Sequence, residues 1–213
     1  LIGTGPYKYL GNDGEKIEGL KKDIVPISEP GLEELIAKNV KAKRLFFTTD
    51  TREGIHQSDV IFIAVGTPCR KDGRADLSSV ESVAKEIAKE TEEYKVIVEK
   101  STVPVMTGKW MRDMIKSLNS EEVDFDIVSN PEFLREGYAI NDFMHPDRIV
   151  IGVETERARA IMRKLYEPLN VPIVFTNIET AELIKYASNS FLAMKISYIN
   201  AIANICERAG ADV

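Results

Sequence analysis

The stretch Val60-Ile61-Phe62-Ile63-Ala64-Val65-Gly66-Thr67-Pro68 joins a run of six apolar residues to a glycine turn. A strand that is apolar on both faces is typical of a parallel sheet covered by helices on both sides. Glycine and proline then interrupt the regular structure. The stretch therefore predicts a buried strand whose carboxyl end opens into a loop.

The rest of the chain repeats this pattern, with short apolar segments alternating with segments of helical periodicity. The expected strands are 44–48, 60–65, 95–98, 125–128, 148–153 and 171–175. The expected helices are 15–22, 30–39, 77–88, 107–118, 155–166 and 181–209. Residues 9–14 are expected to form a loop, and Trp110 to lie in the core. The alternation predicts an α/β fold with a doubly wound, mainly parallel sheet.

The segment 181–209 is expected to form one long helix, with Thr180 as its N-cap. Its apolar residues recur at near-heptad spacing, which is typical of a packing surface between helices. This stripe comprises Ile184, Ala187, Phe191, Met194, Tyr198, Ile202 and Ile205. We therefore expect the helix to contact another domain or subunit.

The composition excludes several classes of protein. The 213 residues are 44% hydrophobic, which is enough for a sizeable core. The net charge is -6 and the basic residues are dispersed, which argues against a nucleic-acid surface. No apolar run approaches the ~20 residues of a membrane helix. Cys69 and Cys206 lack metal-ligand spacing, so a cytoplasmic protein with reduced thiols is expected, with Cys206 buried.

Three successive predicted strands end in polar loops: Gly66-Thr67-Pro68, Ser101-Thr102 and Asn130-Pro131-Glu132. The carboxyl ends of parallel strands lie on one edge of the sheet, where ligands of such folds bind. Gly66 lets a ligand approach the backbone closely. The hydroxyl groups of Thr67, Ser101 and Thr102 can hold a ribose, a phosphate or a water. The loops therefore predict a ligand site on this rim.

The segment from Asn130 to Gly137 has two carboxylates four residues apart. If the chain becomes helical after Pro131, Glu132 and Glu136 lie on one face. Either Arg135 and solvent screen the two charges, or they face a ligand.

A second polar set lies on the long helix, where Glu182, Lys185 and Asn189 share one face. The simpler interpretation is an exposed ion pair between Glu182 and Lys185. The alternative directs Lys185 and Asn189 into the rim site.

Five separated motifs resemble the UDP-glucose/GDP-mannose dehydrogenase family of nucleotide-sugar 6-dehydrogenases. They are Val65–Pro68 with Asp72–Leu77, Lys100–Val105, Asn130–Gly137, Pro146–Gly152, and Thr180–Asn189 continuing to Gly210–Val213. Arg135-Glu136-Gly137 with Pro146-Asp147-Arg148 resembles the UDP-glucose branch more than the GDP-mannose or UDP-N-acetylmannosamine branches. The resemblance implies a Rossmann-like, NAD-binding domain over residues 1–179. It also implies that residues 180–213 begin the helix that leads to a central dimerisation domain.

The resemblance further implies an NAD-dependent oxidation of UDP-glucose to UDP-glucuronate in two hydride-transfer steps. In this family a cysteine traps the aldehyde, and water hydrolyses the resulting thioester. Glu132 would be the general base of that hydrolysis, Thr102 would hold the water, and Lys185 and Asn189 would stabilise the oxyanion. The implied nucleotide-sugar site comprises Glu132, Phe133, Leu134, Arg135, Lys185 and Asn189. The implied NAD site comprises Gly3, Gly5, Gly66, Thr67, Thr102 and Glu136.

The first departure from the family pattern lies at the amino end. After Gly3-x-Gly5, Lys8 stands at the third glycine position of the dinucleotide fingerprint. Gly11 stands where the ribose-binding acid is expected, and Asp13 follows two positions later. Relative to the family, roughly fifteen residues of the first βαβ unit are lacking. We interpret residues 6–14 as an incomplete part of the domain, with omission of a segment favoured over its loss.

The second departure concerns the cysteine. Neither Cys69 nor Cys206 stands in the family's Gly-Gly-x-Cys context, which follows the long helix. We therefore expect the chain as written to be inactive and its parent to be a homodimeric dehydrogenase. The alternatives are a non-catalytic nucleotide-binding or dimerisation fragment, and a dehydrogenase of another nucleotide sugar.

Overall fold

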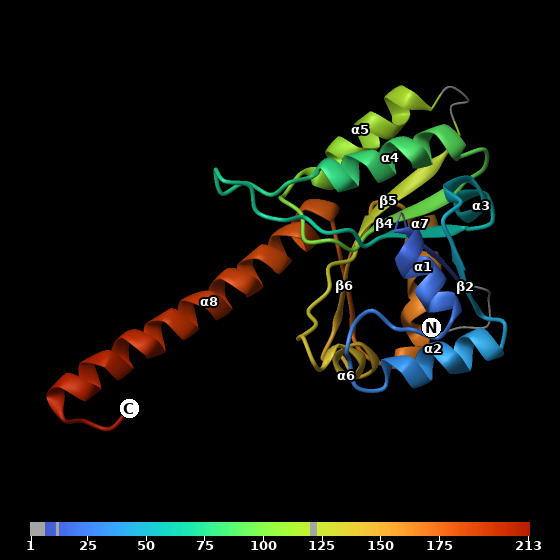
Figure 1. Ribbon diagram of the computed structural model, residues 1–213. Helices are drawn as coiled ribbons and strands as arrows, with labels where there is room; N and C mark the ends of the chain where they lie inside the picture. The colour runs from blue at the N-terminus through green and yellow to red at the C-terminus, as the bar shows by residue number, and fades with distance from the viewer. Residues whose placement is uncertain (1–6, 12, 120–122) are drawn as a thin grey trace.

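The computed structural model describes residues 7–11, 13–119 and 123–213. Within these residues a five-stranded sheet has the strand order β3-β4-β5-β6-β7 (Figure 1). Its strands are β3 (Val60–Ile63), β4 (Lys95–Glu99), β5 (Phe125–Ser129), β6 (Ile149–Gly152) and β7 (Ile173–Thr176). The first three strands pair in parallel, as do the last two, and the single pair Ser129–Gly152 joins the two groups in antiparallel fashion. The predicted mainly parallel α/β sheet is therefore confirmed.

Helices cover both faces of this sheet. α4 (Ser78–Glu90) and α5 (Thr107–Leu118) cover one face, and α7 (Glu156–Tyr166), which the short helix η1 (Glu167–Leu169) follows, covers the other. Successive side chains of a strand point to opposite faces, so Ile97 packs with α4 and α5 while Val96 and Val98 pack with α7. This two-sided burial explains why the strands are apolar throughout.

The amino-terminal part adds a separate two-stranded parallel sheet. It pairs β1 (Tyr7–Leu10) with β2 (Leu45–Thr48) and carries α1 (Gly14–Lys21) and α2 (Leu32–Lys41). The expected loop at 9–14 is wrong, because Tyr9 and Leu10 belong to β1 and α1 begins at Gly14. Aromatic and aliphatic residues favour a strand once a partner such as β2 is present.

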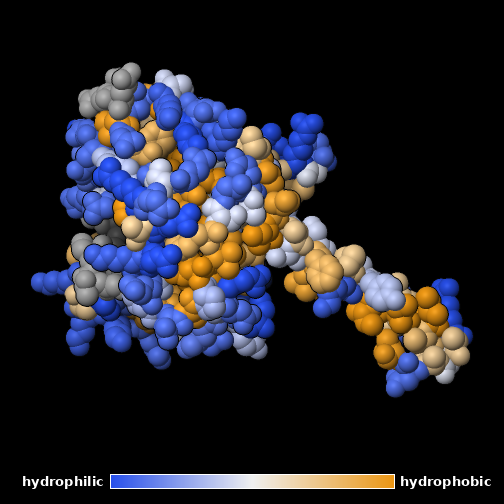
Figure 2. Space-filling model, turned by 180° about the vertical axis from the view of Figure 1, so that it is seen from behind, coloured by the Kyte–Doolittle hydropathy of each residue, from blue (hydrophilic) through white to orange (hydrophobic). Residues whose placement is uncertain are grey.

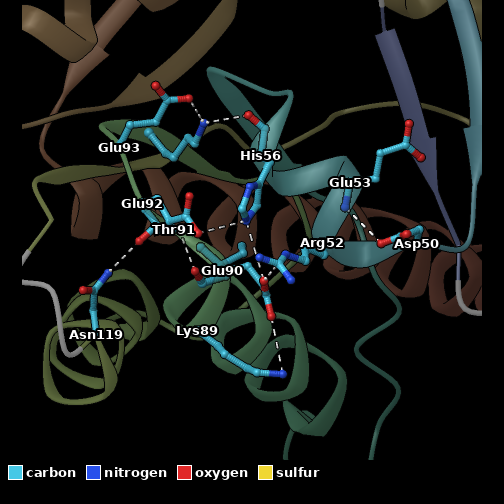
Figure 3. Close-up of polar contacts among 12 residues, drawn as sticks. Asp50, Arg52, Glu53, His56, Lys89, Glu90, Thr91, Glu92, Glu93 and Asn119 are labelled. Carbon is cyan, nitrogen blue, oxygen red and sulfur yellow. Dashed lines mark hydrogen bonds and ion pairs between the residues drawn. The ribbon is translucent and has the colours of Figure 1, made fainter.

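Two short helices also escaped prediction, α3 (Thr51–His56) and α6 (Ala139–Met144). α3 joins the amino-terminal part to the end of α4 through a polar cluster (Figure 3). Arg52 lies 3.4 Å and His56 3.6 Å from the same carboxylate oxygen of Glu90. The almost fully buried Lys95 extends the cluster, because its ammonium group contacts Glu93 at 2.9 Å and the backbone carbonyl of His56 at 3.4 Å.

The predicted long helix is confirmed as α8 (Ile178–Ala209), which projects away from the sheets (Figure 1). Its N-cap is Asn177 rather than Thr180, because the Asn177 side chain accepts the Thr180 N–H at 2.8 Å. Glycine lets the first turn pack closely, since a Cβ on Gly152 would lie 2.7 Å from atoms of Asn177, Ile178 and Ala181. This contact fixes the start of α8 against β6.

The projecting part of α8 exposes apolar side chains (Figure 2). Phe191, Met194 and Tyr198 from the predicted stripe are each more than half exposed. Their contact with another domain or subunit stays a prediction. Trp110 is 37% exposed and Cys206 is half-buried, so the expected burial of both is wrong. In the part of the chain that the structure describes, no helix has the length and apolarity needed to cross a membrane.

Candidate active site

The first two predicted rim loops lie side by side. The Thr67 hydroxyl donates to the backbone carbonyl of Thr102 at 2.8 Å, and the Ser101 hydroxyl accepts the Val65 N–H at 3.0 Å. A side chain on Gly66 would meet no atom within 4 Å, so open space lies beside that backbone. The geometry confirms that the loops after β3 and β4 converge.

Asn130 connects this rim to β5 and β6. Its side-chain amide donates to the Val150 carbonyl at 2.8 Å, and its backbone N–H donates to the Glu99 carbonyl at 2.9 Å. Its side-chain oxygen accepts hydrogen bonds from the Tyr166 hydroxyl and from the Lys100 ammonium group, the latter at 3.2 Å. With these bonds, Asn130 is fixed and almost fully buried.

Glu132 and Lys185 form the central contact of the site. The Lys185 ammonium group donates to one carboxylate oxygen of Glu132 at 2.8 Å, and the other oxygen accepts the Leu134 N–H at 2.6 Å. Lys185 also lies 5.3 Å from the ring centroid of Phe133, whose ring contacts Arg148 as well. Only 7% of the Lys185 side chain is exposed, so solvent screens this charge pair weakly.

The surroundings shift the pKa of Glu132 and that of the neighbouring Lys100. Partial burial of Glu132 disfavours its charge, but the Lys185 ammonium group and the Leu134 N–H outweigh this effect and lower its pKa. Burial lowers the pKa of Lys100 to about 8, and the charge of Lys185 adds to the effect while Glu132 opposes it. At neutral pH the site therefore contains an ionised carboxylate among two lysines.

The segment after Pro131 is irregular, so the expectation that Glu132 and Glu136 share a helical face is wrong. The Leu134 N–H donates a hydrogen bond back to the Glu132 carboxylate, so the chain turns here. The next helix, α6, begins only at Ala139. Glu136 is exposed, as is Asn189, one turn beyond Lys185 on α8. Both residues are close to Glu132 or Lys185 in the sequence, but their side chains are exposed to solvent.

Glu182 does not form the exposed ion pair with Lys185 that the simpler interpretation predicts. It is 2% exposed, and its two oxygens accept the Met106 and Gly108 N–H groups, each at 2.7 Å. These N–H groups flank the start of α5, where unpaired donors favour a carboxylate. Burial raises the pKa of Glu182, opposed by the two backbone hydrogen bonds. Of the three polar residues on this part of α8, Lys185 alone reaches Glu132.

A cavity of about 410 Å³ opens beside Glu132, and neither Lys185 nor Asn189 is among its lining residues. Glu132, Phe133, Leu134 and Arg135 line it, as the resemblance implied, and Arg135 forms hydrogen bonds of 2.7 and 3.0 Å with Asp142. Several polar residues of the wall were missed from the sequence. They are Lys100, Asn141, Asp142, Asp147, Arg148 and Tyr166. For Lys100, its position directly after the buried strand β4 was the sequence signal that could have identified it.

The site thus pairs a buried lysine with a half-buried carboxylate on the rim of a doubly wound sheet. Residues 9–170 match the UDP-glucose/GDP-mannose dehydrogenase family, NAD binding domain, and residues 179–213 match its central domain. The chain belongs to this family. As a member of the UDP-glucose/GDP-mannose dehydrogenase family, it uses NAD as its cofactor.

Similar proteins of this family are known from curated sequences and solved structures. UDP-glucose 6-dehydrogenase TuaD of Bacillus subtilis is 54% identical over 94% of this chain and 44% of its own length. UDP-glucose 6-dehydrogenase of Rhizobium meliloti is also 54% identical, over 94% of this chain and 47% of its own. The UDP-glucose dehydrogenase structure from Pyrobaculum islandicum has a TM-score of 0.90 at 39% identity, over 94% of this chain and 47% of that one. The chain thus spans about half the length of these relatives.

The described residues leave space for a dinucleotide at the rim. The open backbone at Gly66 and the hydroxyl-bearing loops after β3 and β4 offer a polar rim without side-chain obstruction. Gly3 and Gly5, which the resemblance implies for the NAD site, lie outside the described residues. Asp13, the acid nearest the expected ribose position, accepts the Lys16 N–H at 3.1 Å and so caps α1.

Proposed function

We propose that this chain is the nucleotide-binding part of an enzyme that oxidises UDP-glucose to UDP-glucuronate in two hydride-transfer steps. The observation that carries the proposal is the 2.8 Å contact between Lys185 and Glu132, because Glu132 also lines a polar cavity. The 54% identity to two UDP-glucose 6-dehydrogenases over 94% of the chain supports this choice of substrate.

NAD+ would supply the hydride acceptor at the rim. Gly3 and Gly5 would approach its pyrophosphate, and Gly66, Thr67 and Glu136 its nicotinamide end. The Thr67 hydroxyl donates to the Thr102 backbone carbonyl, so the loops after β3 and β4 are joined where they would contact the cofactor.

Glu132 would act as the general base that activates water for hydrolysis of the covalent intermediate. Its lowered pKa keeps it ionised at neutral pH, as a base requires. Lys185 would place its charge beside negative charge that develops on the sugar oxygen, and Asn189 would donate an amide hydrogen bond there. Thr102 would hold the water. Phe133, Leu134 and Arg135 would line the nucleotide-sugar site.

The covalent step needs a thiol, and neither described cysteine is suited to it. Cys69 is exposed with its thiol directed at the Arg70 carbonyl, and Cys206 lies near the end of the projecting helix. We propose that the nucleophile comes from the half of the relatives' length that this chain does not span. We further propose a cytoplasmic homodimer in which the apolar side of α8 is covered.

Activity assays with the full-length protein would test the proposed substrate. We expect NADH formation at 340 nm with UDP-glucose at least tenfold faster, in kcat/KM, than with GDP-mannose or UDP-N-acetylmannosamine. The structural likeness to a GDP-mannose dehydrogenase from Pseudomonas aeruginosa, with a TM-score of 0.93 at 36% identity, makes GDP-mannose the necessary comparison. Faster turnover of GDP-mannose would overturn the substrate assignment. Absence of turnover with all three nucleotide sugars would overturn the proposal that the protein is a nucleotide-sugar dehydrogenase.

A further inference from the structure

Glu29 forms a long-range contact that the proposed mechanism does not use. Its two carboxylate oxygens accept the Gly137 N–H at 2.6 Å and the Ala139 N–H at 3.2 Å. The partners are 108 and 110 positions away in the chain. They lie where the loop that contains Glu132 and Glu136 passes into α6. Such charge-assisted hydrogen bonds are stronger than neutral ones.

The carboxylate of Glu29 is presented from a rigid position. Pro30 and Gly31 follow it, and its own carbonyl accepts the Leu32 N–H at 3.1 Å, where α2 begins. Gly31 has φ of +84°, a left-handed conformation that glycine adopts without strain. The segment before α2 passes beside α6 (Figure 1). Glu29 is thus fixed to the amino-terminal part of the chain.

The loop that Glu29 holds is irregular between Pro131 and α6. Its beginning is fixed by the contact of Glu132 with Lys185, while Arg135 binds Asp142 of the adjoining helix α6. Gly137 has φ of +79°, so the chain turns sharply at the point where Glu29 binds it. The contact with Glu29 therefore ties this turn to a distant part of the protein.

β1 and β2 form a sheet of their own, separate from the five-stranded sheet that carries Glu132. Glu29 lies just before α2, in the connection between β1 and β2, and its contact with the loop that contains Glu132 and Glu136 bridges the two parts. If the loop binds the nucleotide sugar and Glu136 approaches NAD, the bridge also links the two ligands. Loss of the carboxylate would leave the turn at Gly137 free to sample other conformations.

We propose that Glu29 is a positioning residue that holds the Glu132–Glu136 loop in its binding conformation from the amino-terminal side. This inference rests on the proposed function for its kinetic consequence, but the contact itself is testable without activity. Since the ordering of a loop chiefly affects binding, we expect Glu29→Ala to raise the KM for UDP-glucose about tenfold while kcat changes less than threefold. Glu29→Gln keeps one carbonyl oxygen as an acceptor and should fall between Ala and wild type.

The test uses the full-length protein, with Glu34→Gln as the matched control because Glu34 is an exposed carboxylate on α2. Hydrogen exchange followed by mass spectrometry would report on the peptide that contains Gly137 and Ala139. We expect faster exchange there in Glu29→Ala, little change in Glu34→Gln, and an intermediate rate in Glu29→Gln, which preserves the size of the side chain and so guards against misfolding.

The two readouts separate the possible failures. Wild-type exchange in both Glu29 variants would overturn the inference, and so would faster exchange with an unchanged KM. A KM increase without faster exchange would also contradict it, because the effect would then not pass through the loop. Absence of turnover in the wild type would instead reject the proposed function, while the exchange data would still decide whether Glu29 holds the loop.

Discussion

The ammonium group of Lys185 lies 2.8 Å from a carboxylate oxygen of Glu132, although 53 positions separate the two residues. One belongs to the first turns of α8 and the other to the loop after β5. The position of the lysine depends on how the start of α8 is seated. Gly108 and Gly152 determine that seating, because a Cβ on either would come within 2.7 Å of Ile178. The pair therefore links the packing of α8 to the chemistry of the rim.

The role proposed for Glu132 predicts a specific defect. In the full-length protein, Glu132→Gln should retain binding of UDP-glucose and NAD but reduce kcat by about 100-fold or more, because water loses its base. The thioester intermediate should then accumulate and appear as added mass by intact-protein mass spectrometry. An unchanged steady-state rate would exclude Glu132 as the base.

Removal of the Lys185 charge should raise the pKa of Glu132. Burial already opposes ionisation of this carboxyl group, and Lys185 is the main group that offsets burial. We expect Lys185→Met to shift the carboxyl titration of Glu132 upward, measured by NMR with 13C-labelled glutamate. Lys195→Met, an exposed lysine on the same helix, serves as the control. Equal titration curves in the two variants would show that the 2.8 Å contact does not set this pKa.

Glu182 predicts an effect on stability rather than on chemistry. In Glu182→Gln, the amide oxygen can accept only one of the Met106 and Gly108 N–H groups well, so one buried donor loses its partner. The free energy of unfolding should fall by about 1–3 kcal/mol. Urea unfolding would measure the loss, with Glu207→Gln on the exposed end of α8 as a control. Equal midpoints in the two variants would contradict this interpretation of Glu182.

The burial of Glu99 should make the stability of the protein depend on pH. Burial raises the pKa of Glu99 from 4.5 to about 8, so between these values the folded chain keeps a proton that the unfolded chain has released. Stability from this group therefore falls as pH rises through the window. Glu99→Gln removes the titration and should gain more than about 1 kcal/mol over wild type at pH 8, but little at pH 5. Denaturation at both pH values would test this, and a gain independent of pH, or equal to that of exposed Glu86→Gln, would reject it.

The sequence predicted the main sheet well, because buried strands such as 95–98 and 125–128 are apolar on both faces and need no distant information. It failed at β1, where a short strand depends on β2 as a partner some forty residues away. It failed again at α3 and α6, which are six residues each and too short for helical periodicity to show. Local patterns therefore identified elements that bury a continuous surface and missed those that tertiary contacts create.

The site residues also divide into those that local sequence patterns identified and those that only tertiary contacts bring together. Convergence of Gly66, Thr67 and Thr102 followed from the topology, since parallel strands end on one edge. The partner of Lys185 did not, because spacing along α8 favoured Glu182, whereas the folded chain directs Glu182 to α5. Glu29 could not be identified at all, since its partners are backbone N–H groups that carry no signal in the sequence.

The proposed two-step oxidation is tested most directly by the number of NADH molecules formed per UDP-glucose consumed by the full-length protein. Limiting UDP-glucose with excess NAD+ would be run to completion, with NADH measured at 340 nm and the sugar nucleotides by chromatography. We expect two NADH and one UDP-glucuronate for each UDP-glucose. One NADH with an aldehyde product, or no NADH, would contradict it.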